Sequence, residues 1–548
     1  MRQTAAFILL LFSVSNHAQT SVSEAEKIAT FFKVWGFLKY YHPEVAKGKS
    51  DWDQEFISKI QTISNLQTKQ QTDDFYINWI SSLGIINPCK TCKNETSGEF
   101  KSNLDFSWLN DSTAFSTTLI GKLQYIRDNR NQGKNYYVQQ DQSDGKTTYE
   151  NEKIYKDSIF PSQQLRLLGL SRYWNIVNYF YPYKYNNERN WNAILLEMIP
   201  KFQNSKDIIS YHLAMRELVV SINDSHASFA TAYTDQYFGL KMAPFQFKII
   251  DNKSVVTSFY NDSLSRNDDI RIGDVFLSLE NKTIEALIEE KEKYISASNK
   301  SVKLRNLAKM IFNGQSDVVN ATFERNGTIS RKAIHRYLYE DLKIQAQNPH
   351  AKAFKVLSEN IGYVDLGILQ EANVDQTLDQ LKDTKAIIFD IRNYPNWTLF
   401  RISNFLNQES KPFVRATKAN LSHPGIFNTE KPLSCGKRNK KPYKGKVILL
   451  VDETTQSRAE FTVMALQTAE NATIIGSQTA GADGTPSLIT FPGNYKTFMT
   501  GTGIYYPDGK ETQRIGIIPD IEVKPTIAGI KSGKDEVLEK AIEWINGK

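Results

Sequence analysis

The segment Thr454–Glu470 contains a serine whose position suits nucleophilic chemistry. Its sequence, TTQSRAEFTVMALQTAE, follows the apolar run 447–451 and places Ser457 at the first turn of a predicted helix. A helix start has backbone N–H groups without intrahelical partners and carries the positive end of the helix dipole. Negative charge that develops on an oxygen beside Ser457 would be stabilised there, with the N–H of Arg458 as first oxyanion donor.

A structural role explains the same residues. Ser457 and Glu460 have the spacing of a capping box, in which the serine caps the helix and the glutamate reaches back to it. Capping boxes are far commoner than catalytic serines, so the spacing alone favours a cap. A nucleophilic role therefore requires a general base elsewhere in the chain.

His226 is the candidate base. It follows Ser225 in the segment 221–229, SINDSHASF, just after a predicted helix. A lone histidine after a helix is more often a cap or a surface residue than a base. The short polar residues around His226 could nevertheless orient an imidazole, which is how a general base is held.

Length, charge and the first residues bound the class of protein. A chain of 548 residues should hold three or four domains. Residues 1–18 have a basic start, an apolar run and a small residue at Ala18, which predicts a signal peptide and an exported protein, periplasmic or secreted. No later run approaches the ~18 apolar residues of a spanning helix, so no transmembrane segment is expected. The net charge of +7, spread over 67 basic and 60 acidic residues, does not indicate a nucleic-acid partner.

The three cysteines partly fit an oxidising compartment. Cys89 and Cys92 could close a small disulfide loop, which leaves Cys435 unpaired. A metal site at the first two is weakly supported, because no second Cys or His pair stands at zinc spacing, and a redox role is weaker still. We expect no metal and no cofactor.

An aromatic pattern occurs twice. Trp35 and Trp52 recur as Trp174 and Trp191 at the same spacing, and a tyrosine, a proline and an isoleucine recur with them. Each copy has a helix that ends before a proline, a polar connection and further helices. We expect related helical bundles at 19–94, as a degenerate repeat, and at 161–235, with a poorly packed linker or extended subdomain at 95–160. The second copy alone ends in Ser225-His226.

Two further units follow. In 240–340, a strand, a Gly-Asp turn, a second strand and a helix are similar to a PDZ domain, with a general small β module as the alternative. In 355–530, apolar runs at 361–366, 386–391, 447–451 and 473–475 alternate with helical segments at 372–383, 398–407 and 457–469. This alternation predicts an α/β domain with Ser457 after the carboxyl end of a strand. A helix is expected at 531–548.

The order of these features resembles the tail-specific (C-terminal processing) serine peptidase family, and within it the branch typified by the tricorn protease core. The resemblance covers about residues 163–530. Its ordered markers are Asp224-Ser-His226, Ile272-Gly-Asp274, Asp390-Ile-Arg392, Ser457-Arg-Ala-Glu460, Gly476–Gly484 and Gly516-Ile-Ile-Pro-Asp520. It implies a multidomain α/β protein whose C-terminal peptidase domain is ClpP/crotonase-like.

The resemblance assigns roles by position. Ser457 matches the nucleophile, and Arg458 the residue whose N–H lines the oxyanion hole. The other main branch uses a lysine base in a loop that here has Ala482 and Asp483, so a Ser-Lys dyad is excluded. His226 matches the tricorn-type base, with Ser225 as its hydroxyl partner.

Two positions depart from the family pattern. The carboxylate expected three residues before Gly516 is Gln513, with Glu511 two residues upstream, so either Glu511 shifts in or Gln513 orients Ser225 as a neutral partner. The second oxyanion donor usually comes from a glycine-rich turn. That turn here contains Pro395, which has no N–H, so the N–H of Tyr394 or Asn396 would have to serve.

The sequence therefore predicts a serine endopeptidase or carboxy-terminal processing peptidase that acts on exported or unfolded polypeptides, reached through their carboxyl-terminal segments, by acyl-enzyme chemistry. The alternative is a catalytically impaired member that binds peptides or other ligands, which the departures at 395 and 513 would suit. The sequence does not determine the oligomeric state.

Overall fold

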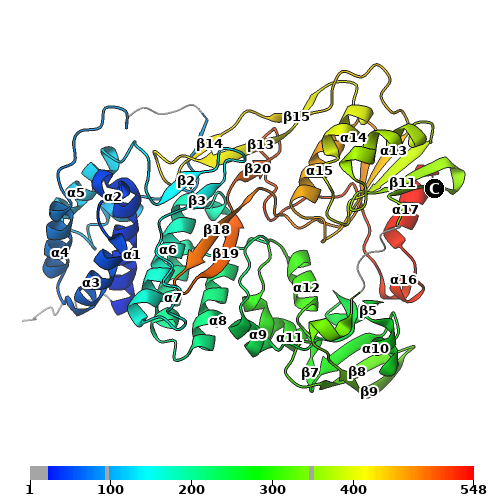
Figure 1. Cartoon of the computed structure of the whole chain (residues 1–548), viewed down its shortest axis with the longest axis horizontal. Helices are drawn as coiled ribbons and strands as arrows, with labels where there is room; N and C mark the ends of the chain where they lie inside the picture. Colours follow the sequence, from blue (N-terminus) through cyan, green and yellow to red (C-terminus); the bar gives the residue numbers. More distant parts are fainter. Residues whose placement is uncertain (1–22, 93–97, 345–350, 548) are drawn as a thin grey trace, which may run out of the picture.

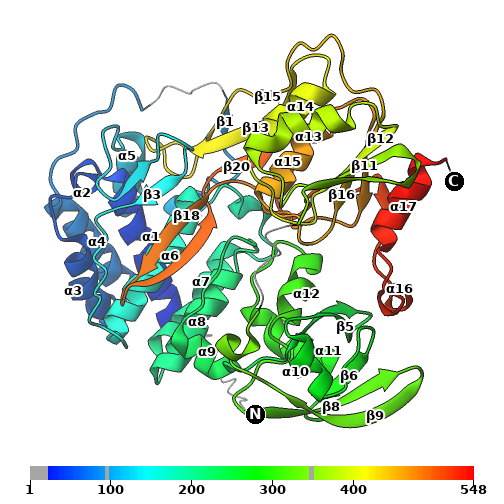
Figure 2. The ribbon, with the colours of Figure 1, turned by 45° about the vertical axis from the view of Figure 1, so that its right-hand side comes forward.

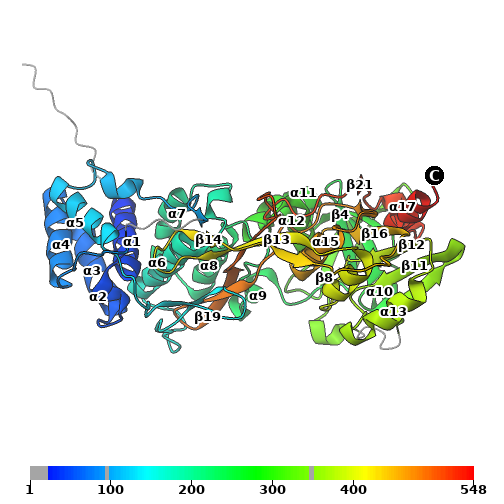
Figure 3. The same ribbon diagram turned by 90° about the horizontal axis from the view of Figure 1, so that it is seen from above.

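A computed structural model describes residues 23–92, 98–344 and 351–547. The predicted signal peptide at 1–18 lies outside these residues. Helices gather at one end of the long axis and an α/β domain at the other, with a small antiparallel module beside them (Figures 1 and 3). Among the described residues, no helix combines the length and the apolar character needed to cross a membrane.

The aromatic repeat forms two similar bundles. In the first, the Trp35 and Trp52 indoles each donate to the other residue's carbonyl, at 3.1 and 3.2 Å. Trp174 and Trp191 repeat this reciprocal pair, at 3.0 Å both ways. The spacing that recurs in the sequence thus coincides with the same contact in both bundles. Its helices are α1 (Glu24–Tyr41), α2 (Pro43–Ala46), α3 (Trp52–Asn65) and α4 (Lys69–Ser82), then α6 (Gln163–Phe180), α7 (Trp191–Gln203) and α8 (Ile208–Val220).

The two bundles share one hydrophobic core. Helices α1 and α6 approach closely at Gly36, where an added Cβ would stand 1.9 Å from Asn175 Oδ1. Asn175 is fixed there, because its Nδ2 donates to Phe32 O at 3.0 Å and to Ser171 O at 2.9 Å. The bundles therefore form a single helical layer.

The segment 95–160 was expected as a poorly packed linker or extended subdomain, but its described residues, 98–160, contribute to that layer. They include β1 (Glu99–Phe100), α5 (Thr117–Asp128), β2 (Val138–Gln140) and β3 (Thr147–Tyr149). Leu119 and Leu123 of α5 are buried in the shared core. Glu152 forms ion pairs with Arg172 and Lys39, all three side chains being nearly excluded from solvent. The prediction failed because the segment is polar on average, although a few of its apolar residues have helical spacing and enter the core.

The cysteines adopt the expected states. Cys89 and Cys92 form a disulfide, and Cys435 is free and buried. The closed loop lies in the helical layer, where Cys89 N–H donates to Asn129 Oδ1 at 2.7 Å.

A small module follows the second bundle. Its antiparallel sheet has the order β4-β5-β6-β8-β9, with β7 beside β6, so β4 and β9 are edge strands. Helix α12 lies next to β4 and faces the α/β domain (Figure 2). The elements are α9 (Ala232–Phe238), β4 (Phe245–Ile250), β5 (Lys253–Phe259), α10 (Asp262–Asn267), β6 (Val275–Leu279), β7 (Lys282–Thr283), α11 (Ile284–Lys291), α12 (Lys300–Ala308), β8 (Val318–Arg325) and β9 (Thr328–His335).

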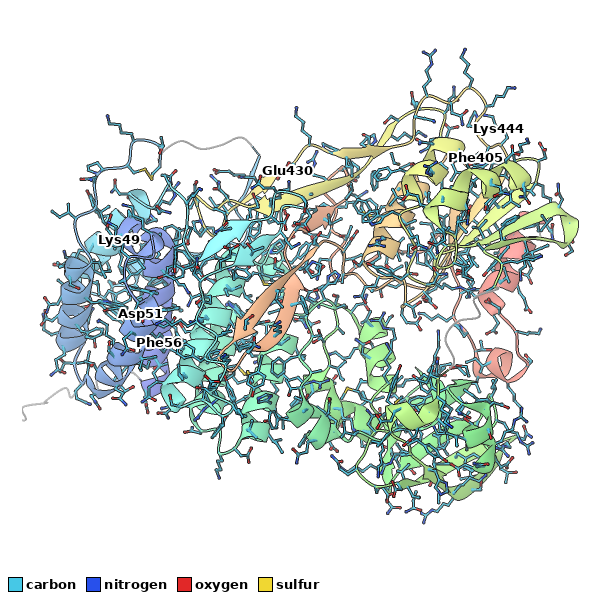
Figure 4. All side chains as sticks on the ribbon, in the orientation of Figure 1. Lys49, Asp51, Phe56, Phe405, Glu430 and Lys444 are labelled. Atoms are coloured by element: carbon cyan, nitrogen blue, oxygen red, sulfur yellow. A yellow bond between two sulfur atoms is a disulfide. The ribbon has the colours of Figure 1, made fainter. Side chains whose placement is uncertain are left out.

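The α/β domain is built on a six-stranded sheet of order β10-β11-β12-β16-β17-β21, parallel except for the β10–β11 pair. The predicted apolar runs are its central strands β11 (Ile361–Asp365), β12 (Ala386–Asp390), β16 (Lys446–Val451) and β17 (Ala472–Gly476). The remaining elements of the sheet and its helices are β10 (Phe354–Leu357), β21 (Ile521–Glu522), α13 (Val374–Leu381), α14 (Leu399–Leu406), α15 (Arg458–Leu466), α16 (Ile527–Lys531) and α17 (Glu536–Ile545). Phe405 and Lys444 of this domain lie far from Phe56 of the first bundle (Figure 4).

Strands that leave this sheet reach back to the helical layer. The second sheet contains β13 (Lys411–Ala419), β14 (Phe427–Thr429), β15 (Leu433–Cys435) and β20 (Gly503–Tyr505). The hairpin of β18 (Pro486–Phe491) and β19 (Tyr495–Thr500) lies against α6, with the ring of Phe491 stacked 5.4 Å from that of Tyr173 (Figure 1). This hairpin carries residues of the α/β chain to the end of the second bundle.

Gly36→Ala tests the close approach of the two bundles. The added methyl group must displace Asn175 and break its hydrogen bonds, so we expect the free energy of unfolding to fall by about 1–3 kcal/mol. The measurement is the midpoint of the thermal and denaturant transitions. Gly121→Ala is the matched control, because Gly121 lies inside α5 with no heavy atom within 4 Å of an added Cβ. Gly121→Ala should stabilise the protein by roughly 0.5–1 kcal/mol. Equal shifts of the unfolding midpoint in the two variants would contradict the close approach of α1 and α6 at Gly36.

Candidate active site

Ser457 occupies a strained turn between a strand and a helix. Strand β16 ends at Val451 and α15 begins at Arg458, and Ser457 has φ 58° and ψ −122°. A side chain in this region costs of order 1–3 kcal/mol and persists only where its surroundings enforce it. Here the Ser457 N–H donates to Ala482 O at 3.0 Å and to Glu460 Oε2 at 3.2 Å. These two hydrogen bonds of the Ser457 N–H hold the turn in place. Backbone strain of this kind is common at functional sites.

The capping-box alternative describes only part of this geometry. Ser457 and Glu460 stand in the relation of a capping box, and the Glu460 carboxylate accepts the Ser457 N–H. The Ser457 hydroxyl stands in capping position toward the backbone N–H of Glu460. A cap only accepts a hydrogen bond, so the hydroxyl proton is still available to a base.

Glu460 fixes the loop that faces Ser457. Its buried carboxylate accepts hydrogen bonds from Thr479 Oγ1, Gly481 N at 2.8 Å and Ala482 N at 3.0 Å, besides the one from Ser457. Burial raises the pKa of Glu460, and these donors oppose the rise because they stabilise the charged form. One carboxylate thus joins the turn at Ser457, the candidate nucleophile, to loop 479–482.

His226 is held by two residues from different parts of the chain. Its Nδ1 lies 2.9 Å from Thr500 Oγ1 and 3.7 Å from Asp224 Oδ1, and its backbone N–H donates to the same Asp224 oxygen at 3.0 Å. Burial lowers the pKa of His226, and Asp224 opposes this effect. The ring is therefore neutral near pH 7, as a general base must be. Because Thr500 occupies Nδ1, Nε2 is the nitrogen free to accept a proton.

Ser457 and His226 are tied to the same pair of segments. Ser457 bonds to Ala482, and two residues later Gly484 lies so close to the hairpin end that an added Cβ would meet Thr500 Cγ2 at 3.0 Å. Thr500 in turn contacts His226. In the described structure no hydrogen bond joins Ser457 directly to the imidazole.

The expected hydroxyl partner has another neighbour. The Ser225 hydroxyl accepts the Ser298 N–H at 2.8 Å, and the Ser225 N–H donates to Ser298 Oγ at 2.8 Å. This reciprocal pair joins the end of the second bundle to the start of the segment that leads into α12. Ser225 makes no hydrogen bond with the ring of His226 in the described residues.

The two candidate orienting residues also contact other side chains. Gln513 is fully buried and its Nε2 donates to Tyr181 Oη at 3.4 Å, while Oε1 has no hydrogen-bond partner in the described part of the chain. Glu511 accepts the Tyr185 hydroxyl, and burial raises the pKa of this carboxyl. Neither contacts Ser225 or His226 by a hydrogen bond among the described residues.

The candidate oxyanion donors lie beside the nucleophile turn. The Arg458 guanidinium stacks 4.5 Å from the ring centre of Trp397 and 5.0 Å from that of Tyr394, and its Nη1 donates to Pro395 O at 3.3 Å. The backbone N–H groups of Arg458, Tyr394 and Asn396 donate to no described residue. The geometry therefore leaves all three expected donors free.

A cleft of about 860 Å³ opens beside the site, between β4 and α12. It is continuous with the loop before Ser457, because Glu453 and Thr454 line it. Arg305 of α12 donates to Glu453 O at 2.7 Å, and Lys248 of β4 forms an ion pair with the Glu453 carboxylate at 2.8 Å. The module and the nucleophile loop thus share one surface.

The sequence interpretation missed Asp224 and Thr500 as neighbours of the imidazole. Asp224 carried a local signal, since an aspartate often accepts the N–H two residues on, as it does here from His226. Thr500 carried none, because it lies on a hairpin distant in sequence. Among the described residues, no three His, Cys, Asp or Glu side chains are grouped to hold a metal ion.

The α/β domain matches a known protein family. Residues 360–523 match the model of peptidase family S41. The carboxy-terminal-processing protease of Bartonella bacilliformis is 28% identical over 230 residues, which cover 38% of this chain and 49% of that protein. The chain thus spans about half the length of the curated relative that it matches.

A solved structure shares the fold. Mature CPAF complexed with lactacystin is similar with a TM-score of 0.55 and 14% identity, over 70% of this chain and 99% of that one. The tricorn protease has a TM-score of 0.32 and 13% identity, over 70% of this chain and 37% of that one. At 14% identity, the likeness to CPAF shows the fold alone.

Glu460→Gln tests the link between the nucleophile turn and its loop. The amide replaces one acceptor with N–H donors that face other N–H groups, so we expect a loss of about 1–3 kcal/mol in stability. Thermal unfolding measures it. Glu470→Gln, at a side chain that is 83% exposed, is the control and should change stability by less than about 0.5 kcal/mol. Identical midpoints would show that the Glu460 contacts do not hold the loop.

Proposed function

From the peptidase family S41 domain at residues 360–523, we propose that this chain is a serine peptidase that cleaves polypeptides through an acyl-enzyme. One observation carries the proposal. Ser457 has its hydroxyl at a strained helix start, and His226, with Nε2 free, is tied to the same loop and hairpin. Nucleophile, base and free N–H donors are the parts that acyl transfer requires.

The residues divide the reaction between them. His226 Nε2 takes the proton of the Ser457 hydroxyl as the oxygen attacks the peptide carbonyl carbon. The oxyanion is held by the N–H of Arg458 and by that of Tyr394 or Asn396. His226 then gives its proton to the leaving amine, and the acyl-enzyme forms. A water molecule, deprotonated by His226, releases the acid and restores Ser457.

We assign substrate presentation to the cleft between β4 and α12. An edge strand offers unpaired backbone groups to an extended peptide, which is how PDZ domains bind chain ends. The antiparallel module with its flanking helix suits that PDZ-like role. The relative from Bartonella bacilliformis is named for carboxy-terminal processing, and we extend a preference for carboxyl-terminal or unfolded segments to this chain.

Export is part of the proposal. The predicted signal peptide at 1–18 would direct the chain out of the cytoplasm, to the periplasm or beyond. The Cys89–Cys92 disulfide supports an oxidising compartment. The substrates would then be exported polypeptides.

Labelling with a serine-directed phosphonate tests the chemistry. Wild type should be labelled at Ser457, identified by mass spectrometry of the peptide, because His226 activates that hydroxyl. Ser457→Ala should abolish labelling, and His226→Ala should slow it by about 100-fold or more. Ser58→Ala, at an exposed serine of α3, should be labelled at the wild-type rate. Folded wild type that is not labelled would overturn the peptidase and favour the impaired, ligand-binding alternative.

Leu304→Asp tests the cleft. Leu304 of α12 lines it, and a charge there should weaken binding of a short fluorescein-labelled peptide with an apolar carboxyl end by about tenfold or more. Fluorescence anisotropy measures the affinity. Ile329→Asp is the control, because Ile329 lies exposed on β9 at the opposite edge of the sheet. Equal affinities for both variants would place peptide binding elsewhere.

A further inference from the structure

We propose that Thr500 and Asp224 position and polarise the candidate base, so that the reaction runs through a Ser457–His226–Thr500–Asp224 relay. This rests on the proposed peptidase function and deepens it. Asp224 supplies the carboxylate that the family pattern places at the position of Gln513 in this chain. Thr500 and Asp224 act through His226 and are positioning residues.

Asp224 is a buried carboxylate whose hydrogen bonds come from His226 and Thr500. Its side chain is fully excluded from solvent, and Oδ2 accepts the Thr500 N–H at 2.6 Å. Oδ1 accepts the Thr500 hydroxyl at 3.0 Å and the His226 N–H at 3.0 Å. A buried carboxylate must be hydrogen-bonded or it costs several kcal/mol, roughly 1–3 for each lost donor. These bonds therefore fix the relative positions of all three residues.

The Thr500 hydroxyl sets the tautomer of His226. A hydroxyl has one proton to donate and lone pairs with which to accept. Its proton goes to Asp224 Oδ1, so toward the ring it acts as acceptor and receives the Nδ1–H at 2.9 Å. The Nδ1–Asp224 distance of 3.7 Å is too long for a direct hydrogen bond, which makes the hydroxyl the necessary intermediate. With the proton fixed on Nδ1, the lone pair lies on Nε2.

The relay also stabilises the charged intermediate. When Nε2 takes the Ser457 proton, the ring becomes an imidazolium whose positive charge faces the Asp224 carboxylate through one hydroxyl. The Asp224 carboxylate lies 3.7 Å from Nδ1 in a partly buried site, so it attracts the imidazolium and lowers the energy of the state in which the serine has attacked. No proton reaches Asp224, and the proton on the ring passes to the leaving amine.

The other candidate partners are engaged elsewhere. Ser225 pairs with Ser298, Gln513 bonds to Tyr181, and Glu511 accepts from Tyr185. The other titratable side chains near this cluster are Tyr173 and Tyr181 of the second bundle, beside Asp224, and Asp483 in the loop before Gly484. Burial raises the pKa of Asp483 well above its usual range, which favours its neutral form. Asp224, which is bonded to Thr500 and lies 3.7 Å from His226 Nδ1, is thus the carboxylate beside the ring.

The test uses Thr500→Val and Thr500→Ser in the full chain, with phosphonate labelling and peptide hydrolysis followed against pH. Valine keeps the shape and removes the bridge, so kcat/KM should fall by about 100-fold, mainly in kcat. Serine restores the hydroxyl and should stay within about fivefold of wild type. Thr490→Val, on the same hairpin, is the control and should match wild type. Circular dichroism and the thermal midpoint check that each variant is folded.

The pH profile separates a relay from a structural contact. Asp224 opposes the effect of burial on the pKa of His226, so Asp224→Asn should move the acid limb of kcat/KM to lower pH. Asp224→Asn also replaces the carboxylate oxygen that accepts the Thr500 N–H. Where that variant does not fold, the comparison of Thr500→Val with Thr500→Ser decides the outcome. Wild-type rates and an unchanged profile in Thr500→Val would overturn the relay while labelling of Ser457 in wild type still supports the peptidase. Wild type that is itself unlabelled would overturn the function instead.

Discussion

The buried contact between Asp224 and Thr500 joins the two halves of the candidate site. Asp224 ends the second helical bundle, and Thr500 ends a hairpin of the α/β chain, which lies far away in sequence. A carboxylate excluded from water is stable only when donors surround it, and Thr500 supplies two of the three donors here. The helical layer and the α/β domain cannot separate without exposing this contact, so the position of His226 depends on it.

Glu460 plays a similar part on the other side of the site. Its carboxylate collects donors from the nucleophile turn and from loop 479–482, and so keeps Ser457 in a backbone conformation that an isolated chain would avoid. Two buried carboxylates thus fix His226 and Ser457 separately. Loop 479–484 and the end of the hairpin connect the two, and substrate would complete the arrangement.

The duplicated bundle shows how a scaffold acquires a site on one copy only. Both copies keep the reciprocal tryptophan pair, which specifies how two helices cross. Only the second copy continues into Asp224 and His226, while the first is packed against it across Gly36 and Asn175. The disulfide loop and α5 complete the first copy as part of a common core. The first copy therefore packs against the second, and none of its described residues belongs to the candidate site.

Much of the architecture follows from local patterns. Apolar runs of strand length predicted the central strands β11, β12, β16 and β17, and the tryptophan spacing predicted the repeat, because both depend on residues close in sequence. The same patterns placed Ser457 at a helix start and His226 after a helix. Local composition failed for residues 99–160, where a few leucines at helical spacing outweigh many polar residues once they meet a core.

The partners of the base were decided by tertiary structure alone. Ser225, Glu511 and Gln513 were reasonable expectations from the family pattern, yet each side chain meets Ser298, Tyr185 or Tyr181 first. Thr500 reaches His226 because a hairpin packs on α6, and the stacking of Phe491 on Tyr173 cannot be inferred from residues near either in sequence. The sequence by itself determined which side chains can exchange a proton or attack a carbonyl. Only the packing of distant segments decided which carboxylate and which hydroxyl stand beside the imidazole, because hydrogen bonds depend on distances that long-range contacts set.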